Sequence, residues 1–195
     1  MLDDLKMIHK RDAQDTLGLA EKQWQQSDEG DFLRTEVQAW LPTVPTKHNI
    51  AKQIALECIG RSVVVYASPL LATAARHWKI GFNEHARQLA WVGELSPSEL
   101  VGWTKQPVSK PYAVIELMSE LEPTHVQQAF AASARSLSGL RPEPIRVHAT
   151  GKTPKEQLLW AHNLGDFVTI YTGLLNGVNP RPIEVVEKFK KMMED

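Results

Sequence analysis

The strongest constraint on the fold is the segment Ser62–Tyr66, in which apolar residues follow one another without polar alternation. β-Branched residues favour strands, and a strand without alternation is typically buried on both of its faces. A helical pattern at Ile50, Ile54 and Ile59 precedes this segment and ends at Gly60, a residue suited to the position after a helix. The sequence therefore predicts a sheet that helices cover on both sides.

Three further apolar segments have the length of strands, and helical patterns separate them: 89–92, 112–117 and 144–148. Long helices are expected over 69–87, 124–136, 154–175 and 182–193. Because apolar strands alternate with helices, we predict an α/β fold, a three-layer sandwich around a small, mainly parallel sheet. Two short helices are expected within residues 1–27. We therefore divide the chain into a helical N-terminal extension and linker, 1–45, and an α/β domain, 46–195, that ends in helices.

Charge and cysteine content exclude several classes of protein. The 195 residues carry 22 Lys+Arg against 23 Asp+Glu, so no basic excess is present to neutralise a nucleic acid backbone. Cys58 is the single cysteine and is expected to be a small buried side chain, which leaves no disulfide and no cysteine-rich metal site. No segment has the apolar length of a membrane span or a signal peptide, so we expect no membrane partner and a cytoplasmic location.

Ligands of an open parallel sheet bind at the loops that follow the carboxyl ends of strands. Three segments take that position: 67–69, 93–99 and 148–153. Ser68 in the first loop is a candidate substrate-binding residue. The third contains the sequence Gly-Lys-Thr, but a nucleotide-binding P-loop would need glycine where Arg146 stands. A turn followed by a helix that Thr153 caps is the favoured interpretation.

The histidines do not follow any of the usual zinc patterns. Seven of them are scattered at positions 9, 48, 77, 85, 125, 148 and 162. No two form a His-x-x-x-His pair, and His-Glu-x-x-His is absent. We expect neither a metal ion nor any other cofactor.

Residues 76–85 place an arginine, a lysine and a glutamate at the end of a predicted helix, close to Trp78 and Phe82. A carboxylate among apolar rings can have a raised pKa and act as a general base. A helix with a charged outer face explains the same residues, and chemistry alone favours that explanation.

Four longer segments, taken in order, carry a resemblance. Residues 76–86 are RHWKIGFNEHA, 99–103 are ELVGW, 164–171 are LGDFVTIY and 175–183 are LNGVNPRPI. They resemble the motifs R-W-K-x-x-x-N-E-x-A, E-I-V-G-W, L-G-D-x-V-S-Y-Y and L-N-G-V-D-P-x-P-I of the bacterial and archaeal bifunctional phosphoglucose/phosphomannose isomerases. The resemblance runs from about residue 45 to the end of the chain. It covers the second sugar-isomerase (SIS) domain of that family, and the first has no counterpart here.

The resemblance implies a set of site residues. In that family a glutamate moves a proton between C1 and C2 of the sugar through a cis-enediol, a histidine helps to open the ring, and a lysine near the C-terminus lies in the site. Glu84 matches the glutamate and Lys190 the lysine, with Lys191 as the alternative. Further residues expected to bind substrate are Arg76, Lys79 and Asn83.

Two departures from the family pattern concern catalysis. The family's N-H-N-E is here Ser-Pro-Ser-Glu, with Pro97 in place of the histidine, and proline has no proton to donate. His85, directly after Glu84, is a conjectural substitute. The family holds the phosphate on serine- and threonine-rich loops of the first SIS domain, and no such loops occur in this chain.

These features predict a protein of the sugar-phosphate isomerase family with weak or no activity that still binds a carbohydrate derivative. The alternative is a non-catalytic regulatory or interaction partner that pairs with itself or with a complete isomerase. The expected partners are a sugar phosphate and a second copy of the chain.

Overall fold

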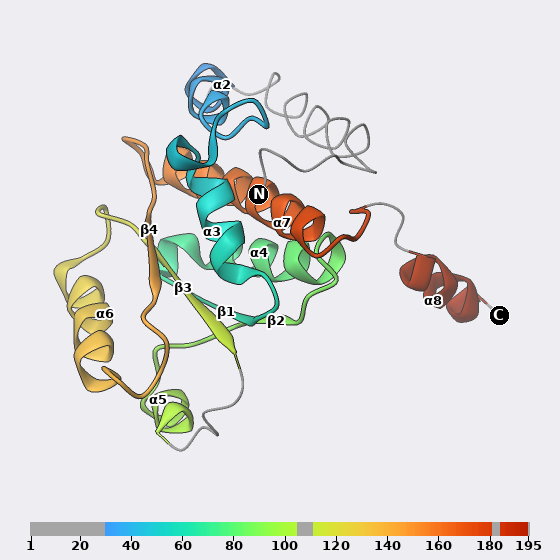
Figure 1. The fold of residues 1–195 in the computed structure, drawn as a ribbon. Helices are drawn as coiled ribbons and strands as arrows, with labels where there is room; N and C mark the ends of the chain where they lie inside the picture. Colours follow the sequence, from blue (N-terminus) through green and yellow to red (C-terminus); the bar gives the residue numbers. More distant parts are fainter. Residues whose placement is uncertain (1–29, 105–110, 181–183, 195) are drawn as a thin grey trace.

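The computed structural model describes residues 30–104, 111–180 and 184–194, and its centre is a four-stranded parallel sheet. The strands lie in the order β2-β1-β3-β4 (Figure 1). Their bounds are Ser62–Ala67 for β1, Ala90–Val92 for β2, Tyr112–Met118 for β3 and Ile145–His148 for β4. All three neighbouring pairs are parallel, so the predicted α/β sandwich is confirmed. The two helices predicted within residues 1–27 lie outside the described residues.

Helices cover both faces of this sheet (Figure 1). On one face lie α2 (Gly30–Gln38), α3 (Ile50–Cys58), α4 (Ala72–Glu84) and α7 (Pro154–Leu175). On the other lie α5 (Pro97–Trp103) and α6 (Thr124–Ser136). Two 3₁₀ turns, Thr46–His48 and Pro69–Leu71, precede α3 and α4, and α8 (Glu184–Glu194) stands apart from the other elements in Figure 1. The helix expected over 69–87 is thus a 3₁₀ turn followed by α4.

The segment 93–99 was expected to be a loop, and this expectation was wrong at its end, where α5 begins. A short helix begins at Pro97 because proline suits the first helical position and because the Ser96 side chain accepts a hydrogen bond from the amide of Glu99. The start of α7 follows the prediction. Thr153 caps it in a capping box with Glu156, and Pro154 occupies the first turn.

The two faces of β1 belong to two separate cores. Val63 and Val65 pack into the larger cluster with α3, α4 and α7, whereas Val64 and Tyr66 pack into the smaller cluster with α5 and α6. All four side chains are completely buried, as the unbroken apolar run predicts for a strand covered on both sides. Cys58 is also fully buried, and burial raises the pKa of its thiol to about 12, so it acts as the predicted apolar side chain.

Helix α2 contributes to the larger core although it precedes the predicted domain boundary. Leu33 and Val37 of α2, and Trp40 just after it, are buried in the same cluster as residues of α7. The hydroxyl of Tyr171 donates a hydrogen bond to the carbonyl of Trp40 at 2.6 Å. A boundary at residue 46 stays a prediction. Among the described residues, no helix is long and apolar enough to cross a membrane.

Helices α4 and α7 approach each other closely through glycines. The buried indole of Trp78 lies against Gly165 and donates its N–H to the carbonyl of Ala161 at 2.7 Å. A Cβ at Gly81 would lie 2.7 Å from the hydroxyl of Thr169, and one at Gly173 would lie 2.5 Å from the carbonyl oxygen of His85. Because backbone atoms and a short side chain form these two contacts, the helices have little room to accept a larger residue.

We predict that Gly165→Ala destabilises the protein by about 1–3 kcal/mol, because the added methyl overlaps an indole that its hydrogen bond holds in place. Gly102→Ala in α5 is the matched control, since a Cβ there meets nothing within 4 Å and alanine favours helix by up to about 1 kcal/mol. Chemical denaturation of both variants measures the difference. Equal free energies of unfolding for the two variants would contradict the close α4–α7 contact.

Candidate functional site

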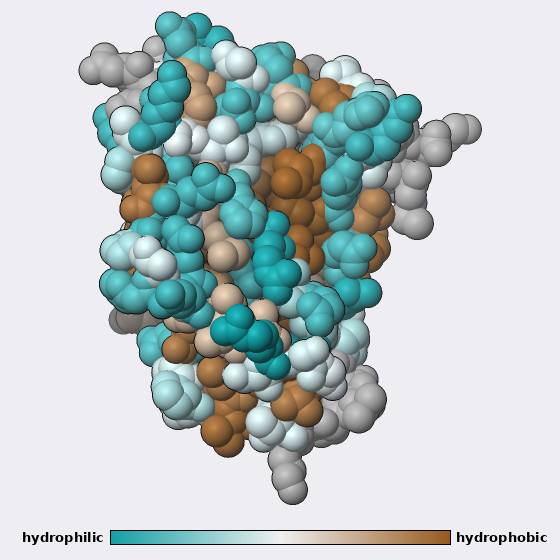
Figure 2. Space-filling view, turned by 90° about the vertical axis from the view of Figure 1, so that its left-hand side faces the viewer, coloured by the Kyte–Doolittle hydropathy of each residue, from teal (hydrophilic) through white to brown (hydrophobic). Residues whose placement is uncertain are grey.

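A cavity of about 370 Å³ opens at the carboxyl ends of β1 and β2. The end of β1, the start of α4, the loop after β2 and one side of α6 form its walls. Figure 2 views the molecule from the side on which α6 lies and shows apolar residues gathered in a hollow between hydrophilic ones. The lining residues are Ala67, Pro69, Ala72, Arg76, Val92, Gly93, Glu94, Leu95, His125, Val126, Ala129 and Phe130.

This cavity has the size and composition of a small-molecule site. Such sites measure roughly 300–1,000 Å³ and combine mostly apolar walls with a few polar groups. The polar side chains here are Arg76 on α4, His125 on α6 and Glu94 in the loop after β2. A guanidinium can bind a phosphate or carboxylate by donating two parallel hydrogen bonds, and a carboxylate can accept hydrogen bonds from sugar hydroxyls.

The loop after β2 is held by a buried tyrosine. The hydroxyl of Tyr66 donates to the Glu99 carboxylate at 3.1 Å and accepts from the indole N–H of Trp103 at 2.9 Å. The other Glu99 oxygen accepts from the amide of Glu94 at 2.5 Å. Burial raises the pKa of Tyr66 to about 12, which keeps its hydroxyl protonated and able to donate. This network fixes the wall of the cavity that carries Glu94.

A carboxylate of the chain itself occupies the amino end of the helical segment that begins at Pro69. The amide of Leu70 donates to Glu122 at 2.6 Å. Exposed amides at the start of a helix are a usual place for phosphate to bind. Here one of them already has an anionic partner.

Two of the predicted substrate-binding residues lie at this end of the fold. Arg76 lines the cavity, and Ser68 stands between Ala67 and Pro69, which both line it. The Ser68 side chain is buried, and its hydroxyl has no hydrogen-bond partner among the described residues. A buried hydroxyl without a partner is unfavourable by about 1–3 kcal/mol.

Other predicted residues lie toward the opposite end of α4. Arg76 and Glu84 are separated by about 12 Å along the helix axis, at about 1.5 Å per residue. Glu84 is half-buried and does not line the cavity. Lys79 is exposed, and the Asn83 amide donates to the carbonyls of Lys79 and Ala90, which ties α4 to β2.

His85 and the C-terminal lysines complete the predicted set. His85 forms a hydrogen bond between its Nδ1 and the Thr169 hydroxyl at 2.9 Å, and burial lowers its pKa, so the neutral ring is favoured. Lys190 and Lys191 are exposed on α8, which lies apart from α4 in Figure 1. Pro97, in the place of the family's histidine, is exposed at the start of α5. Within the described part of the chain, the structure does not bring Glu84 together with either lysine. Their catalytic roles stay predictions.

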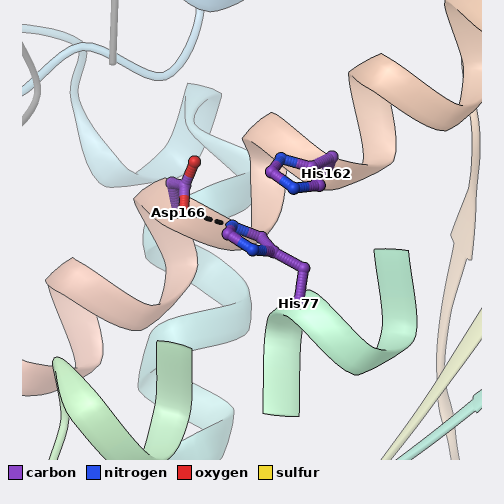
Figure 3. Close-up of side chains that lie close together, drawn as sticks. All are labelled: His77, His162 and Asp166. Carbon is purple, nitrogen blue, oxygen red and sulfur yellow. Dashed lines mark hydrogen bonds and ion pairs between the residues drawn. The ribbon is translucent and has the colours of Figure 1, made fainter. Parts of the chain in front are cut away.

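A second group of polar side chains lies between α4 and α7 (Figure 3). His77 Nε2 is 2.6 Å from a carboxylate oxygen of Asp166, and the rings of His77 and His162 stack with 3.5 Å between their centroids. Burial and the neighbouring His77 lower the pKa of His162. The histidine patterns of the sequence miss this group, because the pair four residues apart on α7 is a histidine and an aspartate.

The sequence also missed two residues of the cavity. Glu94 falls inside a loop that had been selected by its place after β2, but nothing marked it individually. His125 lies at the start of α6, a helix that follows β3, and only the fold places it beside the end of β1.

Comparison with known proteins identifies the family. The model of the bacterial phospho-glucose isomerase C-terminal SIS domain matches residues 47–193. A bifunctional phosphoglucose/phosphomannose isomerase from Aquifex aeolicus (strain VF5) is 25% identical over 146 residues, which are 73% of this chain and 46% of that protein. The chain thus spans about half the length of this relative.

Two solved structures have a similar fold. The crystal structure of a glucose-6-phosphate isomerase-like protein from Thermus thermophilus aligns with a TM-score of 0.65 at 23% identity, over 80% of this chain and 52% of that one. The C-terminal domain of glucosamine-fructose-6-phosphate aminotransferase from Francisella tularensis aligns with a TM-score of 0.53 at 9% identity, over 98% and 54%. At these identities the two structures support the fold alone. Because the family model covers most of the chain, this protein belongs to the family of bacterial phospho-glucose isomerase C-terminal SIS domains.

Proposed function

We propose that this chain binds a sugar phosphate, or a related anionic carbohydrate, in the cavity at the carboxyl ends of β1 and β2. The observation that carries the proposal is the position of Arg76, which combines a permanent positive charge with a largely apolar cavity at the usual ligand end of a parallel sheet. His125 and Glu94 add polar groups from the facing walls. The family relationship supports a sugar phosphate as the class of ligand.

Side chains, rather than backbone amides, would recognise the phosphate. Glu122 already accepts a hydrogen bond from the amide of Leu70, and Glu99 from the amide of Glu94. These amides are therefore occupied, and the two carboxylates add negative charge near both loops. The Arg76 guanidinium is the main group on this side that attracts an anion.

We further propose that isomerisation by this chain alone is weak or absent. The proton-transferring role predicted for Glu84 requires the reacting carbons beside its carboxylate, within hydrogen-bond reach. Glu84 and the cavity lie at opposite ends of α4, so a small sugar held by Arg76 does not reach Glu84. Groups from outside this chain, such as another SIS domain, would have to complete a catalytic site around Glu84.

The binding proposal predicts that fructose 6-phosphate and glucose 6-phosphate raise the melting temperature, because a ligand at about 100 times its Kd stabilises the native state by about 2.7 kcal/mol. Arg76→Gln should abolish the shift. Lys79→Gln removes an equal charge from the same helix outside the cavity and is the matched control. A shift that survives Arg76→Gln but disappears with Lys79→Gln would place the ligand elsewhere on α4.

The catalytic proposal predicts little or no interconversion of fructose 6-phosphate with glucose 6-phosphate or mannose 6-phosphate by the purified chain. A coupled assay measures this conversion, and Glu84→Gln provides the control for contaminating isomerases. Robust turnover that Glu84→Gln abolishes would overturn the proposal. It would show that a complete site forms around Glu84 without any other protein.

A specific observation also favours the second candidate function, a non-catalytic partner that pairs with another chain. The residues Val185, Phe189, Met192 and Met193 are spaced along one face of α8, and each is at least 64% exposed. The chain also exposes Ile80 and Leu89, which precede and follow Glu84 in the sequence. We propose that α8 packs on the exposed Ile80 and Leu89 of a second copy of the chain. This contact would bring Lys190 toward the end of α4 that carries Glu84 in that second copy.

The pairing proposal predicts a homodimer that Phe189→Glu weakens, because a charge replaces the largest apolar side chain of the exposed α8 face. Sedimentation velocity over a range of concentrations measures the change in the dimer dissociation constant. Lys191→Glu, on the side of α8 away from the four exposed apolar residues, is the control for charge alone. A monomer at all concentrations, or equal weakening by both variants, would contradict pairing through this face.

A further inference from the structure

We propose that His77, His162 and Asp166 form a binding site for a divalent transition-metal ion, represented by zinc, that joins α4 to α7. Each residue offers one ligand atom, and these atoms all lie within 4.8 Å of one another. Figure 3 shows the three side chains close together, with His77 extending from α4 and with His162 and Asp166 on α7. The site is separate from the cavity and involves none of the residues that line it.

Two helices position the ligands. His162 and Asp166 are four residues apart on α7, so their side chains lie on the same face, one turn from each other. His77 reaches them from α4. The relative position of the two helices is fixed beside the site, where Trp78 packs against Gly165 and donates its N–H to Ala161. The ligands therefore come from a rigid scaffold.

The geometry is close to what a four-coordinate ion needs. Nitrogen and oxygen ligands about 2.0–2.1 Å from a tetrahedral zinc ion lie about 3.3 Å from one another. His77 Nε2 and the Asp166 carboxylate already lie 2.6 Å apart. The two imidazoles lie face to face, with an angle of 15° between their planes, so their rings must turn before both lone pairs point at one ion. A water molecule would supply the fourth ligand.

The donor set determines which ions can bind. Imidazole nitrogen suits zinc, copper, nickel and cobalt, whereas calcium and magnesium prefer oxygen ligands alone. The Asp166 carboxylate offsets part of the charge of the ion. An ion can also enter from solvent, because the side chains of His77 and Asp166 are 28% and 18% exposed. A helix–helix contact without any ion, made by the hydrogen bond and the ring stack alone, is the competing explanation.

The test titrates Co²⁺ into the full-length chain after treatment with a chelator. We expect one equivalent to bind and to produce the strong visible absorption of four-coordinate cobalt, and one equivalent of Zn²⁺ to displace it. Zn²⁺ should also raise the melting temperature, because it binds the native arrangement, whereas Mg²⁺ and Ca²⁺ should have no effect. Cobalt that keeps the weak spectrum of its hydrated ion would overturn the proposal.

Variants separate this site from other histidines of the chain. Even residues that only support metal ligands contribute roughly 10–100-fold to affinity, so His162→Ala should weaken binding at least about tenfold. Asp166→Asn keeps the shape of the side chain and should also weaken metal binding. This variant replaces His162→Ala in the test if His162→Ala does not fold. His148→Ala, at the exposed end of β4, should leave the affinity unchanged. Equal losses in His148→Ala and Asp166→Asn, or none in Asp166→Asn, would show that the ion binds elsewhere.

Discussion

The close contact between α4 and α7 is the constraint on which the rest of the structure depends. Glycines at 81, 165 and 173 let the two helices run side by side, and the Trp78 indole fills the space above Gly165. Helix α4 begins at the cavity and ends at Glu84, so its position sets both. Helix α7 is the longest helix described and packs against α2, α3 and α4. A shift between these two helices would therefore move the cavity wall, the Glu84 end and the histidine group together.

One helix thus carries both Arg76 and Glu84 and keeps them apart. Its first two turns carry Arg76, which lines the apolar cavity, and its last turn carries Glu84. The rigid rise of a helix makes this separation independent of side-chain motion, because about 12 Å exceeds the reach of a glutamate. If Arg76 binds a sugar phosphate and Glu84 transfers a proton, as proposed, both residues can act on one small sugar only when a second protein surface completes the site around Glu84. The exposed apolar face of α8 is the part of the chain through which we propose that such a surface is bound.

Local sequence patterns predicted most helices and strands. Contacts between residues far apart in the sequence could not be predicted from these patterns. The sequence shows two of these patterns directly, the unbroken apolar run in β1 and the proline at the start of α7, because each acts within one strand or one helical turn. Helix α5 was missed because it has only seven residues and begins in a loop-like Ser-Pro-Ser segment. His125 and Glu94 line the same cavity, and His77 forms a hydrogen bond with Asp166, only because of how the helices pack on the sheet. No spacing rule in one sequence reports such pairs.

Several charged side chains near the cavity already bind other groups of the chain, which limits the groups that are left to bind a ligand. Glu122 and Glu99 each bind a backbone amide of a strand-end loop, and Glu116 is fully buried in an ion pair with Arg141 at 2.6 Å. Removing Glu116 would leave the buried Arg141 guanidinium without this ionic partner, so Arg141 is committed to the fold and is a poor candidate for binding an anion. Among the described residues, Arg76 remains as the cation that both lines the cavity and is exposed to solvent. The proposed recognition of a negatively charged ligand at this end of the sheet therefore depends on that guanidinium, with His125 as the second cavity residue that can carry a positive charge.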